Sequence, residues 1–201
     1  MIRITDIFLS LNALILFSPV LLLCVVTIRL YDGGPAFFLQ ERVGKDLQLF
    51  QILKFRTMHV SRDASRSGSV SGDNLAAKRA ARAAFQATQV GDPRITPIGR
   101  ILRPLHLDEL PQLINVLKGD MSLVGVRPDT PAQEVDYDPE YWKVRHKYLP
   151  GITGVAQIMA KESTIEERRR LELKWLSNPS LRYYFFVLFR TVHKVLRRTS
   201  L

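Results

Sequence analysis

The sequence is poor in cysteine and lacks the motifs that usually identify a nucleotide-binding fold. Cys24 is the single cysteine and lies within an apolar segment, so no disulfide can form within the chain and a reducing compartment is expected. No closely spaced cysteines or histidines indicate a structural zinc site, and neither a Walker loop nor a Gly-x-Gly-x-x-Gly motif is present. Any nucleotide must therefore be bound in another way.

Acidic residues are scarce relative to basic ones. The 201 residues include 29 lysines and arginines but 19 aspartates and glutamates, which gives a formal net charge of +10. So basic a chain favours anionic partners, such as nucleic acid, anionic lipid or phosphorylated metabolites. The length allows one compact domain together with an anchor or a tail.

One long segment has no charged residue. Residues 7–28 form a run of 22 uncharged residues, which as a helix would be about 33 Å long and could cross a hydrocarbon core of about 30 Å. Ser18 and Pro19 lie in its middle. The proline removes one backbone hydrogen bond and bends the helix, while the serine can satisfy a freed carbonyl. An ordinary kinked transmembrane helix is one interpretation of this segment.

The most informative stretch covers residues 103–128. Asp108 and Glu109 are adjacent there and open an amphipathic segment. Four of its apolar residues have the spacing of one helical face: Leu110, Leu113, Ile114 and Leu117. Pro111 is tolerated only near a helix start and Gly119 indicates the helix end, so the acidic pair is expected at or just before the first turn. There the helix dipole would keep carboxylates ionised, as a nucleophile or a metal ligand requires.

The acidic pair could simply satisfy a helix terminus. Its neighbours favour chemistry instead, because Arg100 and Arg103 precede it and Arg127 and Pro128 follow it after a strand-like run at 121–126. Cations on both sides of a carboxylate pair suit a phosphorylated substrate, whose charge must be neutralised while a carboxylate approaches.

These residues belong to a longer pattern that resembles the bacterial sugar transferases. These are the monotopic phosphoglycosyl transferases that start glycan assembly on a polyprenol phosphate. The resemblance rests on Gly99-Arg100, Arg103, Leu107-Asp108-Glu109-Leu110-Pro111-Gln112, the segment 115–125, and Arg127-Pro128. Residues 40–44, 54–58 and 150–157 also resemble family segments.

The resemblance implies transfer of a phospho-sugar from a UDP-sugar to undecaprenyl phosphate, with polyprenol diphosphate sugar and UMP as products. It implies that Asp108 is the nucleophile and forms an aspartyl phospho-sugar intermediate. Glu109 would assist as an acid/base or electrostatic group. Mg²⁺ is expected at Asp108. The candidates for substrate and phosphate contacts are Lys54, Arg56, Arg103, Arg127 and Pro128. Without the resemblance, Lys54 and Arg56 would be solvated charges at a strand edge.

The resemblance also implies that Ser18 and Pro19 break a re-entrant helix, which dips into one leaflet and returns to the same face. We therefore expect an α/β (α+β) membrane-associated protein with a re-entrant membrane helix at residues 1–30. Residues 31–201 would form a small mixed catalytic domain with interfacial amphipathic helices, at the cytoplasmic face of the bacterial inner membrane. The expected partners are UDP-sugar, undecaprenyl phosphate and membrane lipid, but not nucleic acid, and a homodimer is left open.

Other segments predict the remaining elements. Strands are expected at 37–39 and 49–56 around a turn at 44–46, then a mobile serine-rich loop at 61–73. An alanine-rich helix at 75–89 could lie on the membrane or on the domain, and short helices are expected at 98–102 and 141–148. Residues 150–154 predict a loop and 155–158 a strand, and Thr164 with Glu167 forms a capping box that opens a helix.

The last segment, 183–198, predicts either an interfacial helix or a plain core-packing helix. Its apolar face would consist of Tyr184, Leu188, Val192 and Val195. Its basic stripe would consist of Arg190, Lys194 and Arg197.

Four positions depart from the family pattern. His106 could alter the helix cap or bring a titratable ring to the acidic pair, or could be an ordinary surface or core histidine. Val126 replaces a proline and relaxes a loop at the phosphates. Residues 159–161 and Glu172 put the sugar preference in question.

Two other functions fit the same composition. A basic membrane-surface module could bind anionic lipid or nucleic acid without chemistry, and an inactive relative could serve as a scaffold for partner enzymes. The scaffold is disfavoured because the chain retains all four of the expected site residues, Asp108, Glu109, Arg103 and Arg127.

Overall fold

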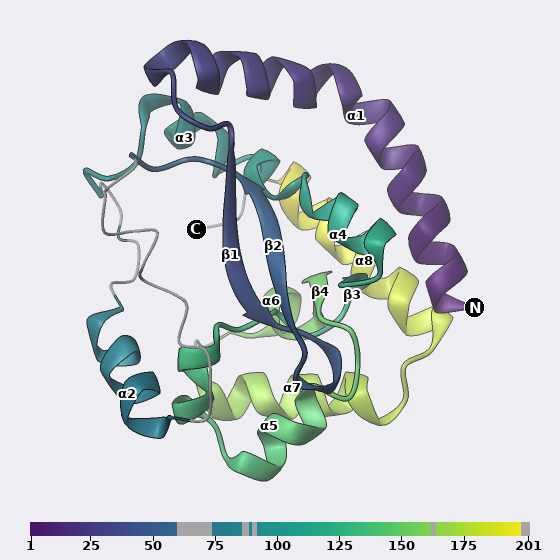
Figure 1. Ribbon diagram of the computed structural model, residues 1–201. Coiled ribbons are helices and arrows are strands. Elements are labelled where there is room, and N and C mark those ends of the chain that lie inside the picture. Colours follow the sequence, from purple (N-terminus) through teal and green to yellow (C-terminus); the bar gives the residue numbers. More distant parts are fainter. Residues whose placement is uncertain (60–73, 86–88, 90–91, 162–163, 198–201) are drawn as a thin grey trace.

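The computed structural model describes residues 1–59, 74–85, 89, 92–161 and 164–197, which combine helices with two small sheets (Figure 1). The helices are α1 (Ile2–Asp32), α2 (Leu75–Ala84), α3 (Pro97–Leu102), α4 (Gln112–Lys118), α5 (Pro139–Arg145), α6 (Val155–Met159), α7 (Ile165–Ser177) and α8 (Leu181–Leu196). The strands are β1 (Phe37–Val43), β2 (Leu49–Phe55), β3 (Ser122–Val124) and β4 (Gly151–Thr153), and the 3-10 helices are η1 (Lys45–Leu47), η2 (Leu107–Glu109) and η3 (Pro131–Asp136). The expected mixture of helix and sheet is confirmed, while the loop predicted at 61–73 lies outside the described residues.

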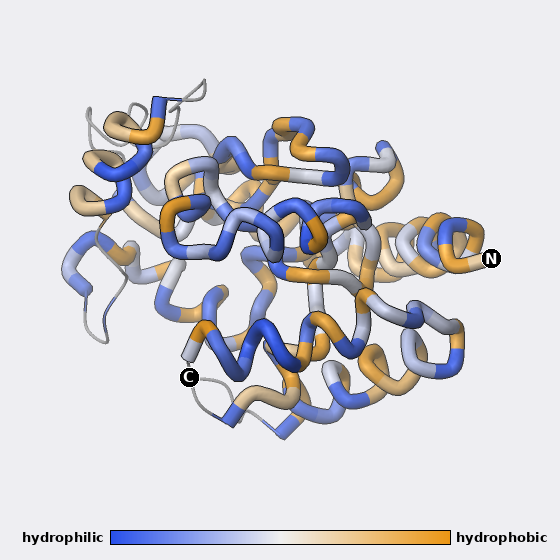
Figure 2. Tube along the Cα trace, turned by 90° about the horizontal axis from the view of Figure 1, so that it is seen from below, coloured by the Kyte–Doolittle hydropathy of each residue, from blue (hydrophilic) through white to orange (hydrophobic). Residues whose placement is uncertain are grey.

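Helix α1 arches over one side of the molecule and bends near its middle (Figure 1). Ser18 and Pro19 lie inside the helix and do not end it, and Ser18 Oγ donates a hydrogen bond to the Ile15 carbonyl at 2.8 Å. The helix ends before Gly33, whose φ of 68° is a left-handed conformation that glycine adopts without strain. By length and composition α1 could cross a membrane, and Figure 2 shows hydrophobic residues along it at the edge of the molecule.

The first turns of α1 are attached to the rest of the chain by polar contacts. The Arg3 guanidinium donates to the carbonyls of Val116 and Leu117 at 2.6 and 3.0 Å, at the end of α4 where carbonyls lack helical partners. Asp6 is 1% exposed, and its Oδ1 accepts three hydrogen bonds. They come from Ser122 Oγ at 3.0 Å, Leu123 N at 2.9 Å and Tyr184 Oη at 2.6 Å.

The last turns of α1 are attached to the same body. Asp32 forms a two-pronged ion pair with Arg56, the residue after β2, in which Nη1 lies 2.6 Å from Oδ2. Cys24 and Ile28 are buried in a cluster with Phe55. Both ends of this apolar helix therefore contact one globular unit.

The predicted hairpin is confirmed, because β1 and β2 pair antiparallel along their full lengths. The outer edge of β2 is covered by Asn115 of α4. Its Oδ1 accepts from Leu53 N at 3.0 Å, and its Nδ2 donates to Gln51 O at 2.8 Å. Since two strands alone are marginally stable, α4 completes this sheet.

The prediction for residues 150–158 was wrong in two respects. Residues 151–153 form β4, which pairs in parallel with β3, and residues 155–159 form α6 instead of a strand. The glycines of this segment permit close backbone contact. A Cβ on Gly151 would lie 2.1 Å from Gly125 N, and a Cβ on Gly154 would lie 2.1 Å from Gly125 O.

Helices α6, α7 and α8 cover the β3–β4 pair around a shared core. The buried residues of this core are Val124, Val126, Val155, Trp175, Leu176, Tyr184 and Val187. The apolar face expected for α8 is buried at Tyr184 but exposed at Val192, which is 57% exposed. Phe189, at 73% exposure, shares the outer side, and Lys194 of the predicted basic stripe donates to the Gln157 carbonyl at 3.0 Å.

Helix α2 is shorter than predicted and packs against η3, so the structure places it on the domain. Lys78 Nζ lies 2.5 Å from a carboxylate oxygen of Glu134, and Arg82 Nε lies 2.6 Å from Asp136.

Substitution of Gly151 by alanine is expected to destabilise the fold by about 3 kcal/mol or more, because the new methyl group would meet the backbone of Gly125. Thermal unfolding of the detergent-solubilised protein measures the effect. Gly33→Asn is the matched control, since its surroundings are open and asparagine tolerates a left-handed backbone. Equal melting temperatures for the two variants would contradict this explanation of the glycine.

Candidate active site

The acidic pair lies in η2, the single turn that connects α3 to α4. Pro111 precedes α4 with a φ of −60°, and Gly119 ends the helix with a φ of 100°, as the sequence predicted. The expected apolar face is only partly correct, because Ile114 is 36% exposed. The buried residues of α4 are Gln112, Leu113, Asn115 and Val116, since the helix turns its polar amide toward β2.

Glu109 is fixed by an ion pair with Lys54 of β2. Lys54 Nζ lies 2.6 Å from Glu109 Oε1, and both side chains are about one-fifth exposed, at 18% and 21%. Burial alone would raise the pKa of the Glu109 carboxyl, but the charges of Lys54 and Arg127 outweigh it and lower that pKa. Glu109 is therefore ionised at neutral pH.

Asp108 has the opposite electrostatic environment. Burial, and then the negative charge of Glu109, raise the pKa of Asp108 to about 6, against the opposing charges of Lys54 and Arg103. Asp108 lies in a partly desolvated turn, and a pKa of about 6 still leaves its carboxylate mostly ionised at neutral pH, as expected. Two adjacent acids with pKa values shifted apart are typical of sites that divide chemical tasks.

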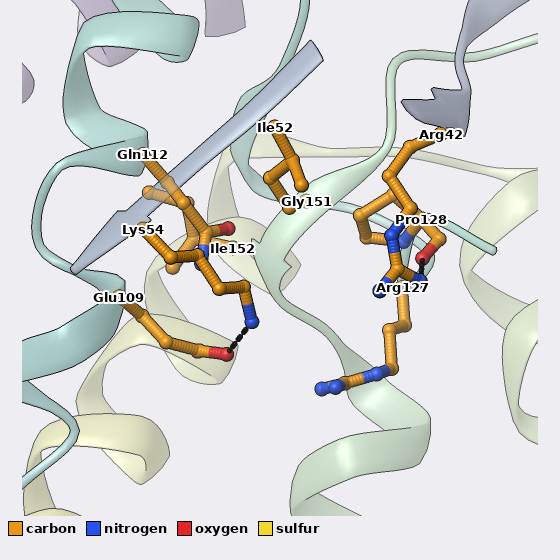
Figure 3. A pocket seen from close by; sticks show the side chains of 9 residues that line it. All are labelled: Arg42, Ile52, Lys54, Glu109, Gln112, Arg127, Pro128, Gly151 and Ile152. Atoms are coloured by element: carbon orange, nitrogen blue, oxygen red, sulfur yellow. Dashed lines mark hydrogen bonds and ion pairs between the residues drawn. The ribbon is translucent and has the colours of Figure 1, made fainter. Parts of the chain in front are cut away.

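A pocket opens beside Glu109, while Asp108 is not among the residues that line it (Figure 3). Its lining residues are Arg42, Ile52, Lys54, Glu109, Gln112, Arg127, Pro128, Gly151 and Ile152. Within the described residues Arg127 makes no side-chain hydrogen bond or ion pair, whereas Arg42 donates to the Pro128 carbonyl at 2.9 Å. The pocket thus gathers several cations beside one carboxylate, which suits an anionic ligand.

The predicted phosphate contacts separate into two groups. Lys54, Arg127 and Pro128 line the pocket. Arg103 lies close enough to lower the pKa of Asp108, and its Nε donates to Thr57 Oγ1 at 2.9 Å. Arg56 lies elsewhere, because its guanidinium binds Asp32 and its Nε donates to the Pro35 carbonyl at 2.6 Å.

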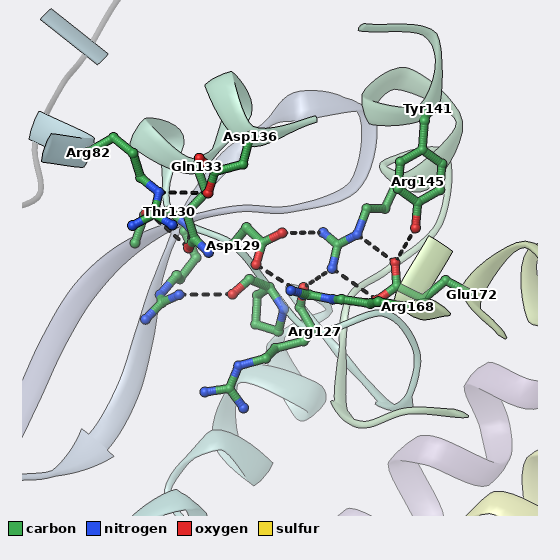
Figure 4. Close-up of polar contacts among 12 residues, drawn as sticks. Arg82, Arg127, Asp129, Thr130, Gln133, Asp136, Tyr141, Arg145, Arg168 and Glu172 are labelled. Atoms are coloured by element: carbon green, nitrogen blue, oxygen red, sulfur yellow. Dashed lines mark hydrogen bonds and ion pairs between the residues drawn. The ribbon is translucent and has the colours of Figure 1, made fainter. Parts of the chain in front are cut away.

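A buried ion network supports the loop that carries Arg127 (Figure 4). Arg145 is 0% exposed; its Nη1 lies 2.9 Å from Asp129 and its Nε 2.7 Å from Glu172. Its Nη2 also donates to the Arg127 carbonyl at 2.6 Å. Arg168 bridges the same two carboxylates at 3.2 Å. Such networks contribute more to conformational specificity than to net stability.

Comparison with known proteins identifies the family. A family model described as "Bacterial sugar transferase" matches residues 1–198. The chain belongs to the bacterial sugar transferase family. It is 38% identical over 203 residues to the UDP-glucose:undecaprenyl-phosphate glucose-1-phosphate transferase of Caulobacter vibrioides, which covers 96% of this chain and 69% of that protein.

Two further relatives match nearly the whole chain. The exopolysaccharide production protein ExoY of Rhizobium meliloti is 35% identical, across 96% of this chain and 84% of the relative. The UDP-N-acetylgalactosamine-undecaprenyl-phosphate N-acetylgalactosaminephosphotransferase of Aeromonas hydrophila is 36% identical, across 95% of this chain. The chain spans only 42% of that relative's length.

The departures from the sugar transferase pattern lie in different environments. Val126 is 3% exposed in the core, and Glu172 is 2% exposed in the ion network, so neither side chain lines the pocket. His106 precedes η2 with a left-handed φ of 54°. Met159 ends α6 and is 43% exposed.

Three contributing residues were missed from the sequence. Arg42 and Gln112 line the pocket, and Arg145 holds the Arg127 loop. The first two fall within segments that resemble the family, but nothing in their local pattern shows which way they point. Arg145 lies in a charged helix, and no sequence signal distinguishes it from exposed neighbours.

The residues present fit a magnesium ion that is bound mainly through its substrate. No cluster of three or more histidine, cysteine, aspartate or glutamate side chains occurs in the described ranges, which excludes an all-protein cage there. Mg²⁺ commonly uses one or two carboxylates together with phosphate oxygens and water. Asp108 and Glu109 provide such a pair.

Asp108→Asn is expected to stabilise the protein above pH 6. The folded carboxyl has a pKa of about 6 against an ordinary value of 3.8, so its ionisation destabilises the fold by up to about 3 kcal/mol. The gain should shrink as the pH falls from 6 and vanish below 3.8, where both states are protonated. Urea unfolding across this pH range measures it.

Asp92→Asn is the opposite-sign control, because hydrogen bonds from Arg94 lower the pKa of Asp92 to about 2. That variant should lose stability at neutral pH, and its loss should fade as the pH approaches 2. A pH-independent effect of Asp108→Asn would contradict the raised pKa.

Proposed function

We propose that this chain transfers a sugar phosphate from a UDP-sugar to undecaprenyl phosphate, with UMP and undecaprenyl diphosphate sugar as products. The observation that carries the proposal is the position of Glu109, the neighbour of Asp108, in a cation-lined pocket of a bacterial sugar transferase. Relatives whose names specify undecaprenyl phosphate as acceptor support it.

Asp108 would act as the nucleophile in two successive displacements. An oxygen of its carboxylate attacks the sugar-bearing phosphorus, and the bond from that phosphorus to the UMP oxygen breaks. A phosphate oxygen of undecaprenyl phosphate then attacks the aspartyl phosphate, which forms the new diphosphate and restores the Asp108 carboxylate. A covalent step of this kind divides one difficult transfer into two.

The neighbouring side chains would hold and neutralise the substrate. The Arg127 guanidinium makes no hydrogen bond or ion pair in the described residues and can bind the diphosphate, on a loop whose backbone Arg145 fixes. Lys54 holds Glu109 in place. Burial, and then the charge of Glu109, raise the pKa of Asp108, which increases the basicity of the attacking carboxylate. The positive charge of Arg103 would offset the negative charge of the Asp108 carboxylate.

Asp108 and Glu109 would hold Mg²⁺ together with the donor's phosphates. The ion would supply neutralisation of the diphosphate charge, which otherwise repels the approaching carboxylate.

We further propose that α1 is re-entrant and that the chain lies at the cytoplasmic face of the bacterial inner membrane. Arg3 and Asp6 at one end of α1, and Asp32 at the other, all bind the same globular unit. A helix that crossed a bilayer would separate its ends by about 30 Å of hydrocarbon. The exposed Phe189 and Val192 of α8 offer a second contact with membrane lipid.

Asp108→Asn is expected to reduce UMP release by about 10⁴-fold or more, because an amide cannot form the aspartyl phosphate. The assay uses solubilised protein, Mg²⁺, undecaprenyl phosphate and a panel of UDP-sugars. With labelled donor and no lipid acceptor, the unsubstituted chain should become labelled and the variant should not.

Glu166→Gln removes an exposed carboxylate and serves as the matched control. Undiminished UMP release by Asp108→Asn would remove Asp108 from its role. Lipid binding without UMP from any donor would favour a non-catalytic basic scaffold.

Both ends of α1 are expected to react from the cytoplasmic side only. In a Cys24→Ala background, one cysteine is introduced in a tag before Met1 or at Tyr31, which is 44% exposed. A membrane-impermeant maleimide is then applied to intact spheroplasts and to inverted vesicles. Labelling of the two positions from opposite sides would show a spanning helix instead.

A further inference from the structure

Gln112 is the first residue of α4 and lies one helical turn beyond Glu109. It is 2% exposed, and its side chain lines the pocket with Lys54 and Glu109 (Figure 3). Polar side chains buried to this degree normally have hydrogen-bond partners within the protein.

The amide of Gln112 lacks such a partner. Its Nε2 is buried and finds no acceptor in the part of the chain that the structure describes. Asn115 on the same helix is also 2% exposed, yet its Nδ2 donates to Gln51 O at 2.8 Å and to Asp120 Oδ2 at 3.1 Å. Two buried amides of one helix thus differ, and only the one at the pocket has an unused donor.

An unused buried donor lowers the stability of the folded protein. A residue that breaks this rule at a pocket is typical of a functional position, where the missing partner is the ligand. Asn115 is buried because its amide binds the edge of the sheet. Gln112 forms no such bond, so its burial needs another explanation.

The surroundings of Gln112 define the ligand chemistry. Arg42, Lys54 and Arg127 line the same pocket, and Glu109 is already paired with Lys54. Lys54 and Glu109 neutralise each other, so the lining keeps the positive charges of Arg42 and Arg127 together with the amide of Gln112. They suit an anion with several acceptor oxygens, such as a diphosphate.

We propose that Gln112 Nε2 donates a hydrogen bond to a diphosphate oxygen of the nucleotide sugar. The assignment rests on the proposed function and adds a neutral substrate-binding residue to the charged ones. A neutral donor contacts the diphosphate without adding another positive charge beside the two carboxylates.

Gln112→Met tests the assignment, because methionine keeps the length of the side chain and removes the donor. Calorimetry with UDP, inorganic pyrophosphate and uridine, in the presence of Mg²⁺, measures binding without turnover. We expect UDP and pyrophosphate to bind about 10- to 100-fold more weakly to the variant, with uridine unchanged. The melting temperature without ligand should equal or exceed that of the unsubstituted chain.

Asn115→Leu is the matched control on the same helix. It should lower the melting temperature, because Leu53 N and Gln51 O lose their partners. Gln112→Glu has the shape of the original and adds a negative charge, so it should weaken UDP binding further than Gln112→Met.

Unchanged UDP binding by Gln112→Met would overturn the inference, as would a loss of melting temperature like that of Asn115→Leu. An equal loss for uridine would also overturn it, since the contact would then be to the nucleoside. Failure of the proposed reaction is distinguishable from failure of this inference. In that case the unsubstituted chain would bind UDP but release no UMP from any donor.

Discussion

The contact between Asn115 and the edge of β2 is the constraint on which the site depends. A two-stranded hairpin leaves an edge of unpaired N–H and C=O groups, and Asn115 satisfies one of each. That contact fixes α4 against β2 at Leu53, so the next residue of the strand, Lys54, meets Glu109. The side-chain amide of Asn115 in α4 therefore sets the distance between Lys54 and the acidic pair.

The charges around the site are arranged in two layers with different surroundings. The buried layer pairs Arg145 and Arg168 with the carboxylates of Asp129 and Glu172, so two positive charges balance two negative ones, and Arg145 also holds the Arg127 loop. Arg127 and Lys54 lie nearer the solvent and set the potential that the acidic pair experiences. The positive charge of this basic chain is thus concentrated at the pocket, where the partly buried surroundings strengthen electrostatic interactions.

The sequence predicted those elements whose ends are determined by residues within the element or its turn. Pro111 and Gly119 marked the ends of α4, and the hairpin followed from two apolar runs and a turn. The glycines of residues 150–154 were misread because their role is to admit the backbone of Gly125, which is distant in sequence. The apolar faces of α8 could not be sorted, since periodicity does not say which side meets a core.

The acidic pair was found by resemblance, and the pocket around it was not. Lys54, Arg127 and Glu109 line one pocket, whereas Asp108 lies outside its lining and Arg56 binds Asp32 at the end of α1. Direction and burial of a side chain depend on which elements pack together. A sequence motif therefore located the chemistry but not the residues that surround it.

The bond between Tyr184 and Asp6 joins residues 178 positions apart and bears on the order of assembly. The ribosome delivers α1 first, and the Asp6 carboxylate has no Tyr184 hydroxyl to meet until the last helix has been synthesised. The first turns of α1 therefore gain their full set of polar contacts only after the chain has reached α8.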